Sequence, residues 1–242
     1  MMQERFLYLA IDLLSILFPF LFSFYPKANF SKKWKYLWPA ILITSTIFIV
    51  WDIMFTRIGV WGFNPRYLTG IYFFNLPIEE VMFFICVPYA CVFTYEAVNY
   101  LIKKGISEII VQYITYLLVF FLLSSGLLNL SRWYTATTFI SCSLFIILLK
   151  VIVKPSYLGK FYISFLFILI PFFIVNGILT GAGIEQEVVW YNNAENLGIR
   201  MGTIPFEDTF YGMLLILMNI SIFEELQKRD KKNKPQIHWL IS

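Results

Sequence analysis

The sequence predicts an all-α, polytopic membrane protein with seven transmembrane helices, arranged as two parallel three-helix repeats joined by a linking helix (3+1+3). Two observations predict this fold class. Hydrophobic residues make up 59% of the 242 residues and charged residues only 14%, whereas soluble domains carry about 25% charged residues. In addition, a motif of polar and charged residues recurs in the second half of the chain. The composition excludes a disordered chain, a disulfide-rich scaffold and an ordinary soluble domain.

Seven apolar stretches account for the predicted helices, because a helix needs about 20 mostly apolar residues to cross a bilayer. The mean hydropathy of the whole chain, +0.72, agrees with this interpretation. An odd number of spans places the two ends of the chain on opposite sides of the membrane. The stretches cover roughly residues 6–25, 36–55, 78–100, 109–130, 134–153, 161–180 and 205–223.

Lys and Arg residues are distributed unevenly between the two sides that these spans define. The side of the N-terminus carries five of the 19 and the other side carries fourteen. Because Lys and Arg gather in cytoplasmic loops, we expect an integral protein of the cell (inner) membrane, with its N-terminus outside and its C-terminus in the cytoplasm. The net charge of +4 then reflects topology and contact with anionic membrane lipid, and gives no argument for a nucleic-acid partner.

An internal repeat is the strongest signal in the sequence. The segment Gly70-Ile71, five further residues and Pro77-Ile78-Glu79-Glu80 recurs 128 positions later as Gly198-Ile199, five residues and Pro205-Phe206-Glu207-Asp208. Upstream of the motif, the pair Asp52 and Thr56 matches Asn176 and Thr180 at a spacing of 124. The second copy therefore has four additional residues between its span and its motif.

The repeat predicts a division of the chain into three parts. These are a first three-helix repeat over residues 1–105, a linking transmembrane helix over 106–131, and a second three-helix repeat with a basic cytoplasmic tail over 132–242. Because a single helix joins them, the two repeats share one orientation and a pseudo-twofold axis along the membrane normal. The two motifs should then face each other at one depth, under long loops (57–76 and 181–204) that form ordered caps or re-entrant segments.

Two pairs of adjacent carboxyls begin predicted spans, each directly after a proline (Pro77 and Pro205), a residue suited to the first turn of a helix. Neighbouring residues point about 100° apart on a helix, so one acid of each pair can face the centre of the bundle. Burial favours the neutral acid, and two nearby carboxyls tend to act as one acid and one base. We therefore predict proton-transfer chemistry at Glu79, Glu80, Glu207 and Asp208. The alternative is that these acids only complement the helix dipole.

Other charged and polar residues in or near the spans receive weaker assignments. Asp52 and Asn176 are predicted to support the carboxyl pairs or relay protons. Glu96 and Glu224 are explained by pairing with Lys103 or Lys228, and Asp12, which has no counterpart in the second copy, is unassigned. On the motif side, three arginines are equally well explained as counter-ions or as solvated loop charges: Arg57, Arg66 and Arg200.

Several familiar functional motifs are missing from the sequence. There is no G-x-G-x-x-G fingerprint, no Walker A motif and no Asp-rich motif for binding a diphosphate through Mg²⁺. The single histidine, His238, lies in the polar tail, which excludes chemistry that depends on a buried histidine or on a cluster of histidine ligands. The last span contains no Lys, so that a retinal Schiff base on it is impossible.

The signatures Pro77-Ile78-Glu79-Glu80 and Pro205-Phe206-Glu207-Asp208, with Trp51-Asp52 upstream, resemble those of the small integral-membrane lycopene cyclases. These carotenoid cyclases occur as two short subunits or as one fused chain, and the resemblance to the fused form covers essentially the whole sequence. Where the first copy has Asp52 the second has Asn176, which suggests that the two halves are not chemically equal.

The resemblance implies a redox-neutral isomerisation of lycopene. A carboxylic acid protonates the terminal double bond, the resulting cation closes to a six-membered ring, and a carboxylate removes a ring proton. The β-ionone ends so formed give γ-carotene and β-carotene. The resemblance implies no cofactor and no metal. The partners that it implies are lycopene, entering from the bilayer, and membrane lipid, while association with other carotenoid enzymes stays open.

Two other functions are compatible with the sequence. A 3+1+3 parallel repeat is also a transporter architecture, in which intramembrane acids couple transport to protons. The predicted acids gather near one membrane face while the central parts of the spans are Phe, Leu and Ile, which favours an apolar substrate. A carotenoid hydratase would use the same acid and let water trap the cation.

Overall fold

The computed structural model describes residues 4–26 and 29–233, and within them seven helices are long and apolar enough to cross a membrane. The prediction of a polytopic all-α membrane protein is thereby confirmed. The helices are α1 (Leu7–Phe22), α2 (Trp34–Arg57), α3 (Ile78–Leu101), α4 (Glu108–Leu128), α5 (Trp133–Leu148), α6 (Leu158–Leu179) and α7 (Phe206–Asn233). Short helical turns cover Glu4–Phe6, Phe30–Lys33, Pro65–Tyr67 and, as a π-helix, Leu149–Val153.

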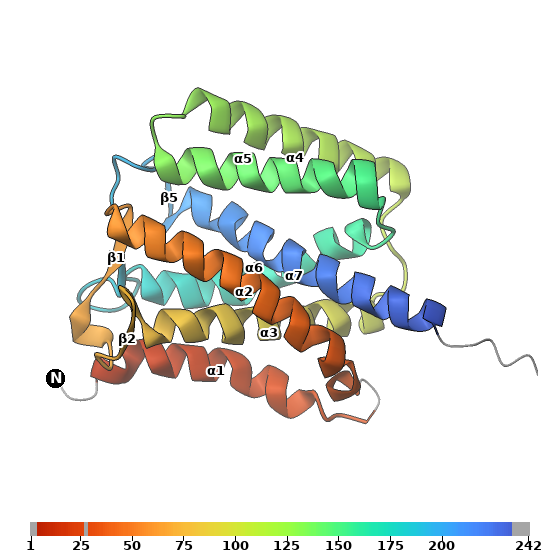
Figure 1. The fold of residues 1–242 in the computed structure, drawn as a ribbon, viewed down its shortest axis with the longest axis horizontal. Coiled ribbons are helices and arrows are strands. Elements are labelled where there is room, and N and C mark those ends of the chain that lie inside the picture. The colour runs from red at the N-terminus through yellow and green to blue at the C-terminus, as the bar shows by residue number, and fades with distance from the viewer. Residues whose placement is uncertain (1–3, 27–28, 234–242) are drawn as a thin grey trace, which may run out of the picture.

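Helices α3 and α7, which carry the two carboxyl pairs, lie at the centre of the bundle and contact each other. On its outer side α3 packs against α1, and α7 packs in the same way against α5. Two of the remaining three helices make contacts between the halves of the sequence, since α2 packs against α7 as well as α3, and α6 packs chiefly against α3. Helix α4 lies at the edge of the bundle beside α5 (Figure 1).

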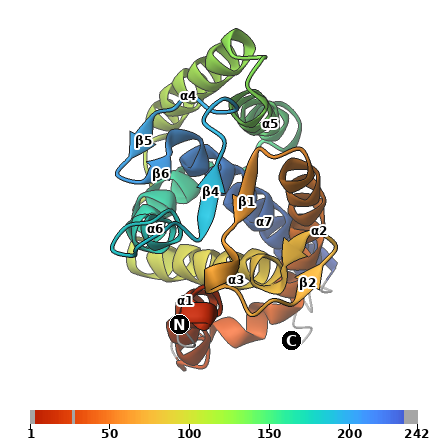
Figure 2. The same ribbon diagram turned by 90° about the vertical axis from the view of Figure 1, so that its left-hand side faces the viewer.

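Three pairs of short antiparallel strands gather at one end of the bundle. Strand β1 (Trp61–Phe63) pairs with β4 (Val189–Tyr191) across the two halves of the sequence. Strands β2 (Tyr72–Phe73) and β3 (Leu76–Pro77) form one hairpin, and β5 (Arg200–Met201) and β6 (Ile204–Pro205) form the other. Figure 2 shows β1 and β4 side by side at the middle of this end, with β2 and the β5–β6 hairpin on opposite sides of them.

Each hairpin leads directly into a central helix and so determines where that helix starts. The amide of Ile78 donates to the carbonyl of Ile71, and the amide of Phe206 donates to the carbonyl of Ile199. The hairpin tips are also tied to the ends of α2 and α6. The side chain of Asn75 donates to the carbonyl of Ile53, and that of Thr203 donates to the carbonyl of Gly177. Corresponding positions thus make the same contact with different side chains.

Several details differ from the sequence predictions. The long loops form the strand pairs described above, and α7 continues as far as Asn233. At the end of the bundle opposite the strands, Glu96 pairs with Lys33 rather than with a lysine that follows it in the chain. Glu224 accepts a hydrogen bond from the hydroxyl of Tyr95. Both contacts join residues far apart in the sequence. They form because this end of α3 lies beside Lys33 and beside α7. His238 lies outside the described residues.

Candidate active site

A cavity with mostly apolar walls lies between α1, α3, α6 and α7 and ends beside the strand pairs. Its empty space is about 1140 Å³, including the part that is open to the outside. Most of the side chains around it are apolar, so the cavity is suited to an apolar ligand. Three carboxyl side chains, Asp52, Glu80 and Asp208, line it.

The first carboxyl pair is divided between two environments. Glu80 lines the cavity and accepts a hydrogen bond from the hydroxyl of Tyr8 in α1. Glu79, which is fully buried, does not line the cavity. One of its oxygens accepts a hydrogen bond of 2.7 Å from the backbone amide of Thr69, in the loop before the hairpin. The helical rotation of about 100° between neighbours thus directs one acid to the cavity and the other to the backbone.

The second pair repeats this division. Asp208 lines the cavity and accepts hydrogen bonds from the hydroxyls of Tyr134 in α5 and Tyr191 in β4, the second of them 3.0 Å long. Glu207 is fully buried and accepts from the backbone amide of Leu197 at 2.7 Å and from the hydroxyl of Thr135 at 2.6 Å. The inward acid therefore binds tyrosine hydroxyls, while its neighbour holds the preceding loop.

Asp52 and Asn176 both line the cavity, at the strand-bearing ends of α2 and α6. Asp52 accepts a hydrogen bond from the indole N–H of Trp61 in β1, and its second oxygen is buried without a partner among the described residues. The two prolines lie beside the acids. Pro77 adopts the extended conformation that precedes α3, and Pro205 ends β6 just before α7.

The arginines on this side of the bundle do not line the cavity. Arg66 forms ion pairs of 2.7 Å with Glu4 and Glu185, which raise the pKa of its guanidinium. Arg200 lies over the ring of Tyr191, with 5.4 Å between the guanidinium carbon and the ring centre. Burial and the carboxyl of Asp208 raise the pKa of the Tyr191 hydroxyl well above its ordinary value. Tyr191 therefore keeps its proton and remains a donor.

Asp12 lies on α1, one helical turn after Tyr8, and is fully buried. Neither of its carboxyl oxygens has a hydrogen-bond partner among the described residues, and it does not line the cavity. No group of three or more His, Cys, Asp or Glu side chains in residues 4–26 and 29–233 is placed to hold a metal ion.

Sequence reasoning missed the tyrosines that contact the inward acids. Tyr8 and Tyr134 stand 126 positions apart and make the same contact with residues that are 128 positions apart. The spacing can be read from the sequence, but two tyrosines 126 positions apart are informative only when they are compared with the carboxyl motifs, which are 128 positions apart. Tyr191 is the partner of Trp61 in the β1–β4 pair, and no local pattern marks it.

Comparison with known families gives one match. The model of a family described as "Lycopene cyclase" matches residues 5–98 and 131–226, which together make up more than half of the chain. No curated protein and no solved structure matches the sequence. The two matched segments include all the carboxyls and tyrosines at the cavity and leave out α4. The chain therefore belongs to the lycopene cyclase family.

Proposed function

We propose that this protein cyclises the ends of lycopene to β-ionone rings, giving γ-carotene and β-carotene, by acid–base catalysis without a change of oxidation state. The observation that carries the proposal is an apolar cavity in which inward acids from both halves, Glu80 and Asp208, line the same wall. The family match supports a carotenoid cyclase. An acyclic polyene has no polar groups, so a protein can bind it only through apolar contacts. The walls of the cavity, which are mostly apolar, can provide such contacts.

The proposed reaction is balanced in protons. A neutral carboxylic acid gives its proton to the terminal double bond of lycopene and becomes a carboxylate. The tertiary cation is attacked by the nearby double bond, so that one ring bond forms, and a second carboxylate then takes a proton from the ring. The reaction consumes no net proton and needs neither an oxidant nor a reductant, and one proton must pass from the second carboxyl back to the first before the next turnover.

The hydrogen bonds suggest which acid has which role. Glu80 receives one hydroxyl donor and Asp208 receives two. Because donors stabilise an anion, we assign Glu80 as the proton donor and Asp208 as the acceptor. Glu79 and Glu207, which bind backbone amides instead of lining the cavity, are assigned as positioning residues. Asp52 and Asn176 are assigned to polar support of the same wall.

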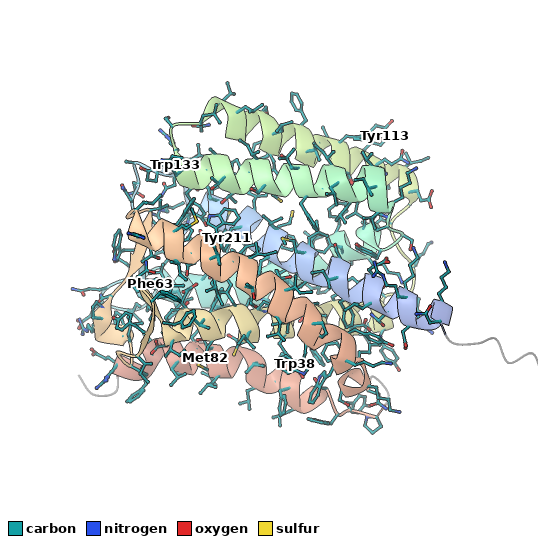
Figure 3. The ribbon with its side chains drawn as sticks, viewed as in Figure 1. Trp38, Phe63, Met82, Tyr113, Trp133 and Tyr211 are labelled. Carbon is teal, nitrogen blue, oxygen red and sulfur yellow. The ribbon has the colours of Figure 1, made fainter. Side chains whose placement is uncertain are left out.

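The cavity also suits a cationic intermediate. Aromatic side chains line it near the acids, and their π faces attract positive charge. These residues are Tyr8, Trp61, Phe63, Phe83, Tyr134, Tyr191 and Tyr211. Figure 3 shows Tyr211 among the side chains inside the bundle, whereas Tyr113 lies on its outer surface. Exclusion of water by such walls would prevent hydration of the cation, which favours a cyclase over a hydratase.

The transporter alternative predicts a polar pathway through the middle of the bundle. Beyond the acids the cavity is lined mainly by apolar side chains, among them Val87, Ile168, Leu215 and Ile216. A proton-coupled carrier of polar solutes would place its polar groups there. The observed lining therefore favours an apolar substrate that enters from the bilayer.

We further propose the topology and the division of the chain that the sequence predicts. The protein lies in the cell (inner) membrane, with its strand-bearing end outside and its lysine-rich end in the cytoplasm. Residues 1–105 and 132–242 form two repeats related by a pseudo-twofold axis, and residues 106–131 link them. The swapped contacts of α2 with α7 and of α6 with α3 support this arrangement.

Pigment analysis after expression in a lycopene-accumulating host tests the function. We expect cyclic carotenes to replace lycopene in cells with the unaltered protein, and Glu80→Gln to leave lycopene unchanged. Glu225→Gln, an exposed-face variant at the opposite end of α7, is the control for expression and insertion. Hydroxylated products would show a hydratase, and unaltered lycopene in cells with properly inserted protein would refute both enzyme functions.

A further inference from the structure

The cavity is one-sided, although the acids at its end come from both halves of the chain. Helix α6 contributes Ile168, Pro171, Phe172, Val175, Asn176, Leu179 and Thr180 to its wall, whereas α2, the helix that corresponds to α6, contributes only Asp52. A symmetric pair of repeats would form two such cavities, one beside α6 and one beside α2. The cavity described above lies beside α6.

The space beside α2 is filled by aromatic rings. Phe48 in α2 and Phe84 in α3 are both buried, and their ring centres lie 6.0 Å apart. Trp51 packs against Phe48 at 5.7 Å and against Tyr211 at 5.4 Å. The hydroxyl of Ser45 also joins α2 to the backbone of Phe84. These contacts bring the aromatic rings together beside α2, where the cavity of the other repeat would lie.

Two of these aromatic residues, Phe84 and Trp51, have smaller counterparts beside α6, whereas Phe48 corresponds to another phenylalanine, Phe172. The spacing of 128 places Gly212 of α7 where α3 has Phe84, and the spacing of 124 places Val175 of α6 where α2 has Trp51. Both Gly212 and Val175 line the cavity. A Cβ atom added at Gly212 would lie 3.5 Å from a ring carbon of Phe172, an ordinary contact. An alanine therefore fits at 212, but an aromatic ring would extend into the open space.

A proline adds to the difference between the two sides. Pro171 lies inside α6 and lines the cavity, and the corresponding residue of α2 is Ile47. A proline within a helix removes one backbone hydrogen bond and displaces the turn that precedes it. Pro171 therefore lacks the backbone N–H donor that Ile47 has in α2, and its ring borders the cavity.

We propose that a single polyene channel between α3, α6 and α7, held open by Gly212 and Val175, delivers one end of the substrate at a time to the acids of both halves. Lining residues on α3 run from Glu80 to Thr94, which corresponds to about 20 Å along the helix axis. A linear polyene fits such a channel lengthwise. The second end must then enter after the half-cyclised molecule has withdrawn and turned round.

This inference rests on the proposed function, and its test uses the intact protein in lipid vesicles with lycopene as the probe. Gly212→Phe and Val175→Trp place in the second half the residues that close the first. We expect each to lower kcat/KM on the order of tenfold or more, because an aromatic ring at either position occupies space that the polyene needs and so weakens lycopene binding. Gly212→Ala should retain most of the activity, because the added Cβ atom makes only an ordinary contact. Gly105→Phe, at an exposed loop glycine with open space around it, should leave the activity unchanged.

The products give a second readout. With one channel, γ-carotene should accumulate first and reach enzyme-free acceptor vesicles before β-carotene appears. Full activity of both Gly212→Phe and Val175→Trp, or doubly cyclised product without free γ-carotene, would overturn the channel while leaving the cyclase function intact. Failure of the unaltered protein to cyclise lycopene would instead refute the function itself. Thermal unfolding of each variant identifies any that does not fold, and the other variant then decides.

Discussion

The hydroxyl of Tyr8 in the first helix donates a hydrogen bond to Glu80 in the third, across 72 residues of sequence. Tyr134 makes the equivalent bond to Asp208, 74 residues away. Because both tyrosines are buried, each inward acid is held in one orientation by a side chain from the helix that packs beside it. The two carboxyls therefore reach the cavity with fixed positions.

Removing the Tyr8 hydroxyl should slow cyclisation without unfolding the protein. Glu80 becomes a carboxylate as it gives up its proton, and the Tyr8 hydroxyl stabilises that negative charge. Because a hydrogen bond to a charged group contributes about 1.5–3 kcal/mol, Tyr8→Phe is expected to lower kcat by roughly tenfold to a hundredfold while KM changes little. The measurement is a time course of lycopene consumption in vesicles. Tyr95→Phe is the matched control, since Tyr95 also donates to a glutamate, at the opposite end of the bundle. Equal losses for the two variants would contradict the assigned role of Tyr8.

The two acids of each pair should respond differently to the same substitution. Glu80→Gln removes the proposed proton donor, and loss of a general acid costs about 10²–10⁴ in rate. Glu79→Gln keeps an oxygen that can accept from the Thr69 amide, so most of the activity should remain. The comparison is made on kcat from purified protein at equal amounts. If Glu79→Gln were as inactive as Glu80→Gln, both acids would have to take part in the chemistry.

Replacing Glu79 or Glu207, the acids that bind backbone amides, should lower the stability of the protein. The loss should grow with the number of hydrogen-bond donors that are left without an acceptor. Each buried donor without a partner costs about 1–3 kcal/mol. Glu79→Ala leaves one such donor, the Thr69 amide, whereas Glu207→Ala leaves two, the Leu197 amide and the Thr135 hydroxyl. We therefore expect the larger fall in thermal unfolding temperature for Glu207→Ala. A larger fall for Glu79→Ala would show that other contacts dominate.

A glycine at the tip of the first hairpin should stabilise the protein. Phe74 adopts φ +55° and is 78% exposed, and the corresponding residue of the second hairpin is Gly202, with φ +66°. A left-handed conformation costs a residue with a side chain roughly 1–2 kcal/mol, so Phe74→Gly should raise the unfolding temperature by a few degrees. Phe74→Ala, which keeps the strain, serves as the comparison. No difference between them would mean that the aromatic side chain stabilises the tip by an equal amount.

The seven helices were predictable because each is a long apolar stretch. A helix that crosses the bilayer must be apolar along its length, whichever other helices pack against it. The strand pairs were not, since β1 and β4 are short and pair across more than a hundred residues. The continuation of α7 to Asn233 was not predicted either. Its last ten residues are largely polar, so the apolar stretch that marks the helix in the sequence ends near Phe223.

The carboxyls of the candidate site were found from the sequence, but their division was not. The motif places Glu79 beside Glu80 without stating which one faces inward, because α3 is almost uniformly apolar and has no polar face to reveal its rotation. The tyrosine partners depend on how α1 packs against α3 and α5 against α7. The difference between the space beside α2 and the cavity beside α6 depends on single residues such as Phe84 and Gly212. Their effect can be recognised only once the packing of the helices is known.

Helix α4 contributes no residue to the cavity wall, packs mainly against α5, and lies in the stretch between the two family-matched segments. In the proposed topology, α4 crosses the bilayer once and returns the chain to the face from which the second half starts. Its packing still depends on particular residues, because a Cβ atom added at Gly126 would lie 2.8 Å from a side-chain carbon of Ile140, and the hydroxyls of Thr115 and Tyr162 are hydrogen-bonded. We therefore expect another apolar helix of equal length to replace α4 if it keeps these two positions.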